Sequence, residues 1–289
     1  MTATLDAPVV TPPLPDRFAG SVARAARRAV ASPGLVLSWL VIVTVVLWAL
    51  VPEWFTSYSP YEGDVDASFS PPSLEHLFGT DRLGRDLLAR TIYGASTTLT
   101  ATLLAVLVGF VVGSLVGLLS GFVGGRADAI IMRFVDVLLA IPALLLAMTV
   151  VTALGYGTLN VALAVGISAV AAFARVMRSE VLKVAQSEYV EAAYGSGAGF
   201  RRVVVRHVLP NSVAAVLSLA ALECGAAILA VAALGFLGYG APPPEPEWGL
   251  AVSEGRDYLA TYPYISILPG VVIAVVVLAT NRISKSLGD

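Results

Sequence analysis

The feature that most constrains this chain is a series of six apolar segments, each close to the length of a helix that crosses a lipid bilayer. Crossing the hydrocarbon core takes about 20 consecutive, mostly apolar residues in helical conformation. Only 13% of the residues are charged, against about 25% in soluble domains. The sequence therefore predicts an all-α membrane protein with six transmembrane helices. The predicted spans are residues 35–51, 97–124, 129–154, 158–174, 212–238 and 264–280.

The positions of the Lys and Arg residues predict how the chain is oriented in the membrane. Six spans put both termini on the same side, and with that side in the cytoplasm all but four of the 18 Lys and Arg residues are cytoplasmic. The exceptions are Arg82, Arg85, Arg90 and Arg256. Because cytoplasmic loops of membrane proteins carry an excess of Lys and Arg, we expect cytoplasmic N- and C-termini.

The region before the first span has a different composition. Residues 1–30 combine a Pro-rich stretch with a basic segment and predict a flexible, basic cytoplasmic N-terminus. No small-residue cleavage site follows the first apolar run, so we interpret that run as a retained transmembrane helix. Residues 31–94 are expected to form this helix and an extracytoplasmic loop, and residues 95–289 the main transmembrane domain.

A long polar segment, EYVEAAYGSGAGFRRVVVRHVLPN (188–211), separates the fourth and fifth spans. Ser187 is a favourable N-cap for a first short helix, and Pro210 is expected to close a second one. Glycine enters turn conformations freely, and three glycines predict a hinge between the helices: Gly195, Gly197 and Gly199. The residues alone leave two interpretations, a cytoplasmic element that docks into another protein or a solvated loop whose arginines contact lipid headgroups.

The spacing in this segment resembles the EAA loop of the permease subunits of ABC importers. The matching positions are Glu191, Ala192, Ala193, Gly197, Leu209 and Pro210. In that family the loop, here residues 176–211, forms coupling helices that seat in ATP-hydrolysing subunits, so the resemblance implies an ATPase-coupling role for these residues. Three further stretches resemble the dipeptide and oligopeptide branch of the family. They are LFGTDRLGRDLLARTIYGA (77–95), RADAIIMRFVDVLLAIPALLLAM (126–148) and AALGFLGYGAPPPEPEWG (232–249).

The resemblance implies a permease subunit of an ATP-driven importer in the cytoplasmic membrane of a prokaryote. The expected fold is the six-helix, MetI-like fold of type I importers, with residues 95–289 as its permease domain. The expected function is to form half of the translocation path for dipeptides or short oligopeptides; permeases for nickel-chelates or haem share the scaffold and are the alternative.

The same resemblance implies a set of partners. They are a second homologous permease subunit, two ATP-binding cassette ATPase subunits, an extracytoplasmic substrate-binding protein and membrane lipid. ATP and Mg are expected on the ATPase subunits, and this chain itself is expected to bind no cofactor.

Several other function classes lack the residues that they need. The chain has no GxxxxGK(S/T) sequence and its only lysines are Lys183 and Lys285, so it builds no P-loop ATPase site. No catalytic residue is predicted. His76 and His207 fall on opposite sides of the membrane, so no metal site is predicted, and a pI near 5.7 gives no reason to expect nucleic acid. A stand-alone channel or secondary transporter is the alternative from another class; it predicts internal repeats, several intramembrane charges and helices broken at mid-membrane.

Glycines recur every four residues along the second predicted span. They are Gly109, Gly113, Gly117, Gly121 and Gly125. Four residues turn a helix by about 400°, so the glycines form a slowly drifting ridge on one face. Small residues let helices approach closely in membranes. The favoured interpretation is a packing seam within this chain; the alternative is a face that meets a partner permease or shifts during gating.

The remaining predictions concern charged residues and a proline within the predicted spans. Glu223 is the only carboxylate deep in a predicted span, where a charge costs about 2.5–3.5 kcal/mol. It either lines the translocation path, near the amino terminus of a peptide, or is a hydrogen-bonded structural residue. Arg133 and Asp136 are three residues apart and are expected to form a local ion pair; the alternative is a role at the inner mouth of the path. Pro142 is expected to kink the third span.

Overall fold

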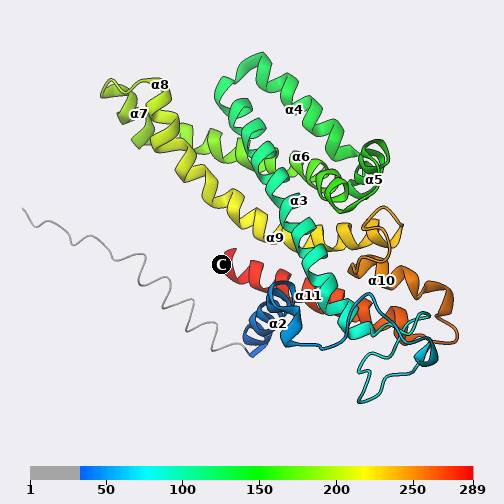
Figure 1. Cartoon of the computed structure of the whole chain (residues 1–289). Helices are drawn as coiled ribbons and strands as arrows, with labels where there is room; N and C mark the ends of the chain where they lie inside the picture. The colour runs from blue at the N-terminus through cyan, green and yellow to red at the C-terminus, as the bar shows by residue number, and fades with distance from the viewer. Residues whose placement is uncertain (1–32, 289) are drawn as a thin grey trace, which may run out of the picture.

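The computed structural model describes residues 33–288 as a set of long packed helices (Figure 1). The predicted N-terminal region, residues 1–30, lies outside the described residues. Within the described part there is no strand, and one isolated bridge pairs Thr80 with Asp86. The α-helices are α2 (Pro33–Leu50), α3 (Leu87–Val123), α4 (Gly125–Ala140), α5 (Ala143–Leu154), α6 (Thr158–Ala185), α7 (Glu188–Gly195), α8 (Phe200–Val203), α9 (Leu209–Phe236), α10 (Trp248–Glu254) and α11 (Tyr264–Gly288). Shorter turns are η1 (Pro52–Trp54), η2 (Val65–Ala67), η3 (Val204–Val208) and η4 (Arg256–Tyr258).

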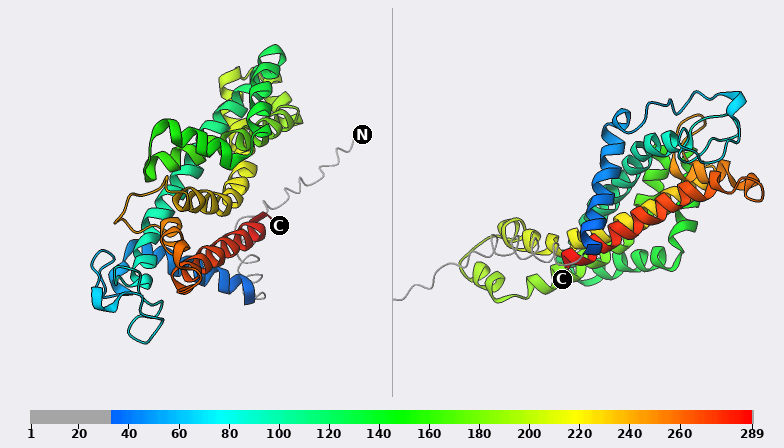
Figure 2. Two further views of the ribbon diagram at one scale, coloured as in Figure 1. Left: turned by 90° about the vertical axis from the view of Figure 1, so that its right-hand side faces the viewer. Right: turned by 90° about the horizontal axis from the view of Figure 1, so that it is seen from below.

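The molecule has two distinct ends, which all views separate (Figures 1 and 2). At one of them, the proximal end, α7 and α8 project beyond the long helices. At the other, the distal end, the loop of residues 51–86 lies near α10 and the turns that flank it. The helices α3, α6 and α9 run from the proximal end into the rest of the bundle. A movement of α7 and α8 can therefore be passed on directly along these helices.

The number of spans agrees with the prediction. Five helices (α2, α3, α6, α9 with its preceding turns, and α11) are long and apolar enough to cross a membrane, and the bent pair of α4 and α5 supplies a sixth span. Three helices are longer than predicted, since α3 begins at Leu87, α6 continues to Ala185 and α11 continues to Gly288. The carboxylate of Asp86 starts α3 by accepting a hydrogen bond from the Ala89 N–H (2.6 Å). Apolar length therefore marks the membrane-crossing part of a helix and not its ends.

The third predicted span, residues 129–154, is not a single kinked helix. Two residues separate α4 from α5, and the two helix axes differ by 97°. Ile141 is extended (φ −89°, ψ 129°), as residues before proline prefer. Pro142 has no N–H to continue α4, and its carbonyl accepts the first hydrogen bond of α5 from Leu146 (3.0 Å). The span bends at Pro142 as expected, but the bend is a break between two helices and not a kink within one.

The glycine ridge of α3 lies against α6 of the same chain. A methyl group on Gly113 would come within 2.5 Å of the Phe173 Cβ, and one on Gly117 would overlap the Ala174 carbonyl oxygen. The other ridge members buried against α6 are Gly109 and Gly121. Gly125 does not belong to the ridge: it begins α4 with φ +57°, and a methyl group there meets no atom within 4 Å. The four-residue period ends where the chain leaves α3.

Charged residues before and within the first turns of α3 form a buried network at the distal end. The Arg85 guanidinium contacts the carboxylates of Asp81 (2.6 Å) and Glu254 (3.4 Å). Arg90, which is 1% exposed, donates to Glu254 (3.0 Å) and to two backbone carbonyls of the distal loops. The network joins the 51–86 loop to α3 and α10. These charges hold the distal end together, a role that their sequence positions did not indicate.

Candidate functional site

The polar segment at the proximal end, residues 186–211, is called the proximal loop here. It forms two short helices, α7 and α8, joined by a glycine turn as predicted. Gly197 adopts φ +81° in this turn, a conformation that favours glycine over residues with a side chain. Ser187 precedes α7, but its hydroxyl donates to the Val184 carbonyl (2.5 Å) and caps no helix N–H. The predicted side-chain cap at Ser187 is therefore wrong.

Pro210 does not close the second helix. The chain stays helical from α8 through η3 to the end of α9, with Pro210 in the first turn of α9. In η3, a π-helical turn, the Leu209 N–H bonds to the Val204 carbonyl five residues earlier. A proline ring clashes with the carbonyl four residues before it, here Arg206, and the wider turn relieves that contact. The predicted helix end is wrong, and the proximal loop continues directly into a membrane span.

An apolar cluster seats the proximal loop on the bundle. Val190 of α7, Val203 of α8 and Val208 of η3 are each at most 2% exposed. Phe200 packs edge-on against Phe122 near the end of α3, with ring centroids 5.4 Å apart. The cluster also contains Phe173, Met177, Val181 and Val184 of α6. The proximal loop is therefore packed against α3 and α6 and is not a free solvated loop.

The six residues that match the EAA spacing divide between this seat and the surface. Ala193 and Leu209 are partly buried against the apolar cluster. The other four are exposed: Glu191, Ala192, Gly197 and Pro210. The exposed set combines small, flat residues with one carboxylate, which is a suitable contact surface for another protein.

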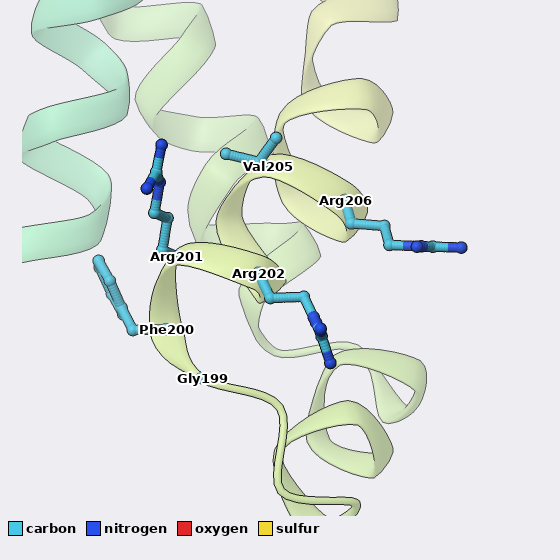
Figure 3. A pocket seen from close by; sticks show the side chains of 6 residues that line it. All are labelled: Gly199, Phe200, Arg201, Arg202, Val205 and Arg206. Atoms are coloured by element: carbon cyan, nitrogen blue, oxygen red, sulfur yellow. The ribbon is translucent and has the colours of Figure 1, made fainter.

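Aromatic and cationic side chains extend this exposed surface. Tyr189, Tyr194 and Phe200 are 44–59% exposed. Phe200 also borders an open hollow of about 720 Å³, whose lining includes Arg201, Arg202, Val205 and Arg206 (Figure 3). In Figure 3 the three arginine side chains point in different directions around the turn, and none forms an ion pair within the described residues. Exposed aromatic and arginine side chains are typical of protein interfaces.

Two ion pairs connect α6 to α4. Arg178 binds Asp128 through two contacts, with Nε–Oδ1 at 2.6 Å and Nη2–Oδ2 at 2.5 Å. Arg175 contacts Asp136 at 2.6 Å. The predicted local pair of Arg133 with Asp136 is therefore wrong, because the carboxylate pairs with α6 and not along its own helix. Spacing within one helix does not show which side chains a neighbouring helix brings close.

Glu223 lines a cavity of about 180 Å³ between α3, α4, α5, α6 and α9. Its side chain is partly buried, and among the described residues no ion pair or hydrogen bond to its carboxylate is found. Leu139 and Ala143, which flank the break between α4 and α5, also line the cavity. The fold thus brings the one deep carboxylate together with the broken span.

Glu247 at the distal end is a buried carboxylate that its sequence position did not mark as special. It accepts hydrogen bonds from the N–H groups of Gly249 and Leu250 (both 2.8 Å) at the start of α10, and it is 3% exposed. A methyl group on Gly235 of α9 would overlap this carboxylate. Burial raises the pKa of Glu247 to about 7, although the two N–H donors lower it. In the sequence, the one hint of this buried capping role is that an acidic residue directly precedes Trp248 and Gly249.

Comparison with known proteins decides the family. Residues 113–288, more than half of the chain, match the family described as binding-protein-dependent transport system inner membrane component. The chain belongs to this family. It is a permease subunit of an ABC importer in the inner membrane and not an enzyme, because separate subunits of such importers hydrolyse ATP. The predicted permease is confirmed, and the comparisons do not support the stand-alone channel or secondary transporter. The broken third span is the one feature of that alternative that the structure shows within residues 33–288.

Relatives of this permease cover most of its length. A Brucella suis biovar 1 protein named as a peptide transport system permease is 37% identical over 276 residues, 96% of this chain and 93% of the relative. An Escherichia coli K12 protein named as a D,D-dipeptide transport system permease is 37% identical over 258 residues, 89% and 87% of the two chains. The glutathione transport system permease of Shigella flexneri serotype 5b is 39% identical over 251 residues, 86% and 83%.

Solved structures confirm the MetI-like fold of the permease. The MetNI methionine ABC transporter, in an inward-facing conformation, matches with a TM-score of 0.54 at 20% identity, over 70% of this chain and 96% of that chain. An amino acid ABC transporter crystallised with histidines matches with a TM-score of 0.54 at 16% identity, over 68% and 92%. At these identities the likeness shows the fold alone.

Proposed function

We propose that this permease forms half of the translocation path of an ATP-driven importer for dipeptides and short oligopeptides. The observation that carries the proposal is the proximal loop, which exposes Glu191, Ala192 and Gly197 while its apolar side packs into the bundle. The names of three relatives refer to peptides, a D,D-dipeptide and glutathione, which supports peptides as the substrate class. None of these names favours nickel-chelates or haem.

The proposed complex contains a second homologous permease, two ATPase subunits and an extracytoplasmic binding protein. In this arrangement the proximal loop lies in the cytoplasm and contacts one ATPase subunit, which carries ATP and Mg. The distal end, with the 51–86 loop and α10, then lies outside and receives the peptide from the binding protein. The excess of Lys and Arg on the proximal side supports this orientation.

The packing of the proximal loop suggests how the permease responds to ATP. ATP binding closes the ATPase dimer and displaces α7 and α8. Buried Val190, Val203 and Val208 transmit the displacement to α6 and α3, and the Arg178–Asp128 pair transmits it from α6 to α4. The continuous helix of η3 and α9 carries it to the Glu223 cavity. The spans then switch between inward-facing and outward-facing states, and hydrolysis resets them.

Two substitutions in the proximal loop test the coupling. Glu191→Arg reverses the charge of the exposed carboxylate, and Gly197→Trp adds bulk to the docking surface at a position with φ +81°. In the full complex reconstituted in proteoliposomes, each variant is expected to lower dipeptide uptake and peptide-stimulated ATP hydrolysis by roughly tenfold or more, the size typical of a central interface contact. Membrane insertion is expected to be normal.

Matched controls separate docking from folding. Gly197→Asn keeps the surface small, and asparagine tolerates positive φ, so uptake is expected to stay within about twofold of wild type. Lys285→Gln removes an exposed charge near the end of α11, outside residues 176–211, and is expected to have no effect. Normal uptake by both Glu191→Arg and Gly197→Trp would refute the coupling role. Transport by the isolated permease without ATPase subunits would refute the proposed function.

A further inference from the structure

We propose that the cavity around Glu223 is a subsite for the positively charged amino group of the transported peptide. This inference rests on the proposed function and deepens it, because it assigns a chemical group of the substrate to one place in the path. Two independent observations meet in this cavity: a carboxylate without a partner and the broken third span.

The Glu223 carboxylate needs a counter-charge. A charge in the middle of a membrane span is costly unless it faces a partner or water. Within residues 33–288, no Arg or Lys side chain lines this cavity, and no cation of the described chain pairs with Glu223. Ser168 carries the one hydroxyl among the described lining residues, and this hydroxyl donates to the Val165 carbonyl (2.7 Å). A cation from outside the chain is therefore the complementary ligand.

The broken span leaves one backbone carbonyl without a helical partner at a residue that lines the same cavity. The Leu139 carbonyl lies in the last turn of α4 and accepts no backbone hydrogen bond within the described chain. Pro142 has no N–H to donate to it, and the hydrogen bonds of α5 begin at the Pro142 carbonyl. Irregular backbone at membrane depth is tolerated where it lines a cavity or water-filled path. Discontinuous helices with free carbonyls coordinate cations in other transport proteins. The geometry thus adds a second type of acceptor that suits an ammonium group.

The size of the cavity limits what it accepts. Its volume of about 180 Å³ equals roughly six water molecules of liquid volume. More than half of its lining residues are alanines, and its edge is exposed at Leu139, Ala143 and Ala226. An open space of this size admits the amino-terminal part of a peptide and leaves the remainder outside, toward the rest of the path.

A charge-selective thiol probe tests the cavity directly. The native cysteine is removed by Cys224→Ser, and Ser168→Cys introduces a thiol into the lining. In the assembled complex, methanethiosulfonate ethylammonium is expected to react roughly tenfold faster than the sulfonate reagent of similar size, because Glu223 attracts the cation. Reaction rates at Leu74→Cys, a site on the distal loop that is 98% exposed, correct for the intrinsic reactivities. Glu223→Gln in the same background is expected to abolish the preference for the cationic reagent. Excess dipeptide, added while the complex turns over, is expected to slow the labelling of Ser168→Cys.

Uptake by charge variants provides the second measurement. Glu223→Gln is expected to lower dipeptide uptake by roughly tenfold while ATP hydrolysis stimulated by the loaded binding protein persists, since the proximal loop is unchanged. Glu223→Asp keeps the charge and is expected to restore part of the uptake. Ser218→Ala changes an exposed hydroxyl on the same helix, α9, outside the cavity and is the control, with uptake expected near wild type.

The outcomes are distinct. An unchanged reagent preference in Glu223→Gln, or labelling that dipeptide does not slow, overturns the subsite. A defect of Glu223→Gln confined to assembly of the complex also overturns it, because the carboxylate then pairs with a cation of the second permease. If the wild-type complex imports no peptide at all, the proposed function fails, and the reagent preference at Ser168→Cys still reports whether Glu223 attracts cations.

Discussion

Among single residues, Glu247 has the environment with the clearest consequence for stability. Its pKa of about 7 lies above the ordinary value of 4.5, since burial disfavours the charged form. The folded protein therefore holds the proton more tightly than the unfolded chain. The resulting stability is fully present below about pH 4.5 and is lost as pH rises through about 7. A difference of this size corresponds to on the order of 3 kcal/mol.

We predict that Glu247→Gln flattens the dependence of stability on pH. Wild-type permease in detergent is expected to have a lower melting temperature at about pH 8 than at about pH 5, as its carboxyl ionises in a buried site. The glutamine variant removes the titration and keeps the shape of the side chain. Thermal unfolding at several pH values measures both curves. Parallel curves for the two proteins would contradict this account of Glu247.

Glycine-to-alanine exchanges test whether the glycine ridge of α3 stabilises the protein by close packing against α6. Gly117→Ala is expected to destabilise the permease by about 1–3 kcal/mol, because the new methyl group overlaps the Ala174 carbonyl oxygen on α6. Gly270→Ala is the matched control: the nearest atom, Val252 Cγ2, is 4.0 Å away, and alanine gains up to about 1 kcal/mol in helix propensity. Melting temperatures of the two variants compare the same chemical change in a crowded and an open site. Equal effects would show that backbone preference and not α3–α6 contact decides stability.

At the scale of helices, the two α4–α6 ion pairs differ in exposure and should differ in strength. The side chains of Arg178 and Asp128 are 30% and 15% exposed, whereas those of Arg175 and Asp136 are 55% and 52% exposed. We predict a coupling energy of about 1–3 kcal/mol for the first pair and below about 1 kcal/mol for the second. Double-mutant cycles with Asn and Gln replacements, read out by unfolding in detergent, measure both. Equal coupling energies for the two ion pairs would mean that their difference in exposure does not change their strength.

The helices also differ from their predicted limits for identifiable reasons. The apolar run of α3 starts near residue 97, but the Asp86 cap begins the helix ten residues earlier in polar sequence. At Pro142 the tendency of proline to disturb a helix was evident, whereas the 97° change of direction depends on what packs beside α5. Local signals therefore identify that a helix exists more reliably than where it starts or turns.

At the scale of the whole molecule, orientation is the property that one labelling experiment decides. In a Cys224→Ser background, Glu75→Cys puts a thiol on the distal loop and Ser196→Cys puts one on the proximal loop, both at exposed positions. We predict that a membrane-impermeant maleimide added to intact cells labels only Glu75→Cys. Labelling of Ser196→Cys is expected after permeabilisation. The reverse pattern would contradict a cytoplasmic proximal loop.

The sequence by itself determined the properties that depend on neighbouring residues along the chain. Apolar length predicted six spans, because a bilayer has a fixed thickness. The positions from Glu191 to Pro210 indicated the importer permease family, and the comparisons confirmed it. The glycine turn of the proximal loop followed from the freedom of glycine at positive φ.

Only the tertiary structure decided which distant residues meet. Asp136 pairs with Arg175 and not with its neighbour Arg133, and four ridge glycines touch α6 whereas Gly125 does not. Glu223 was notable in the sequence as a lone acid, yet its cavity exists only because five helices converge around it. Such contacts depend on how each helix is rotated and tilted against the next, and side chains far apart in the chain set those angles together.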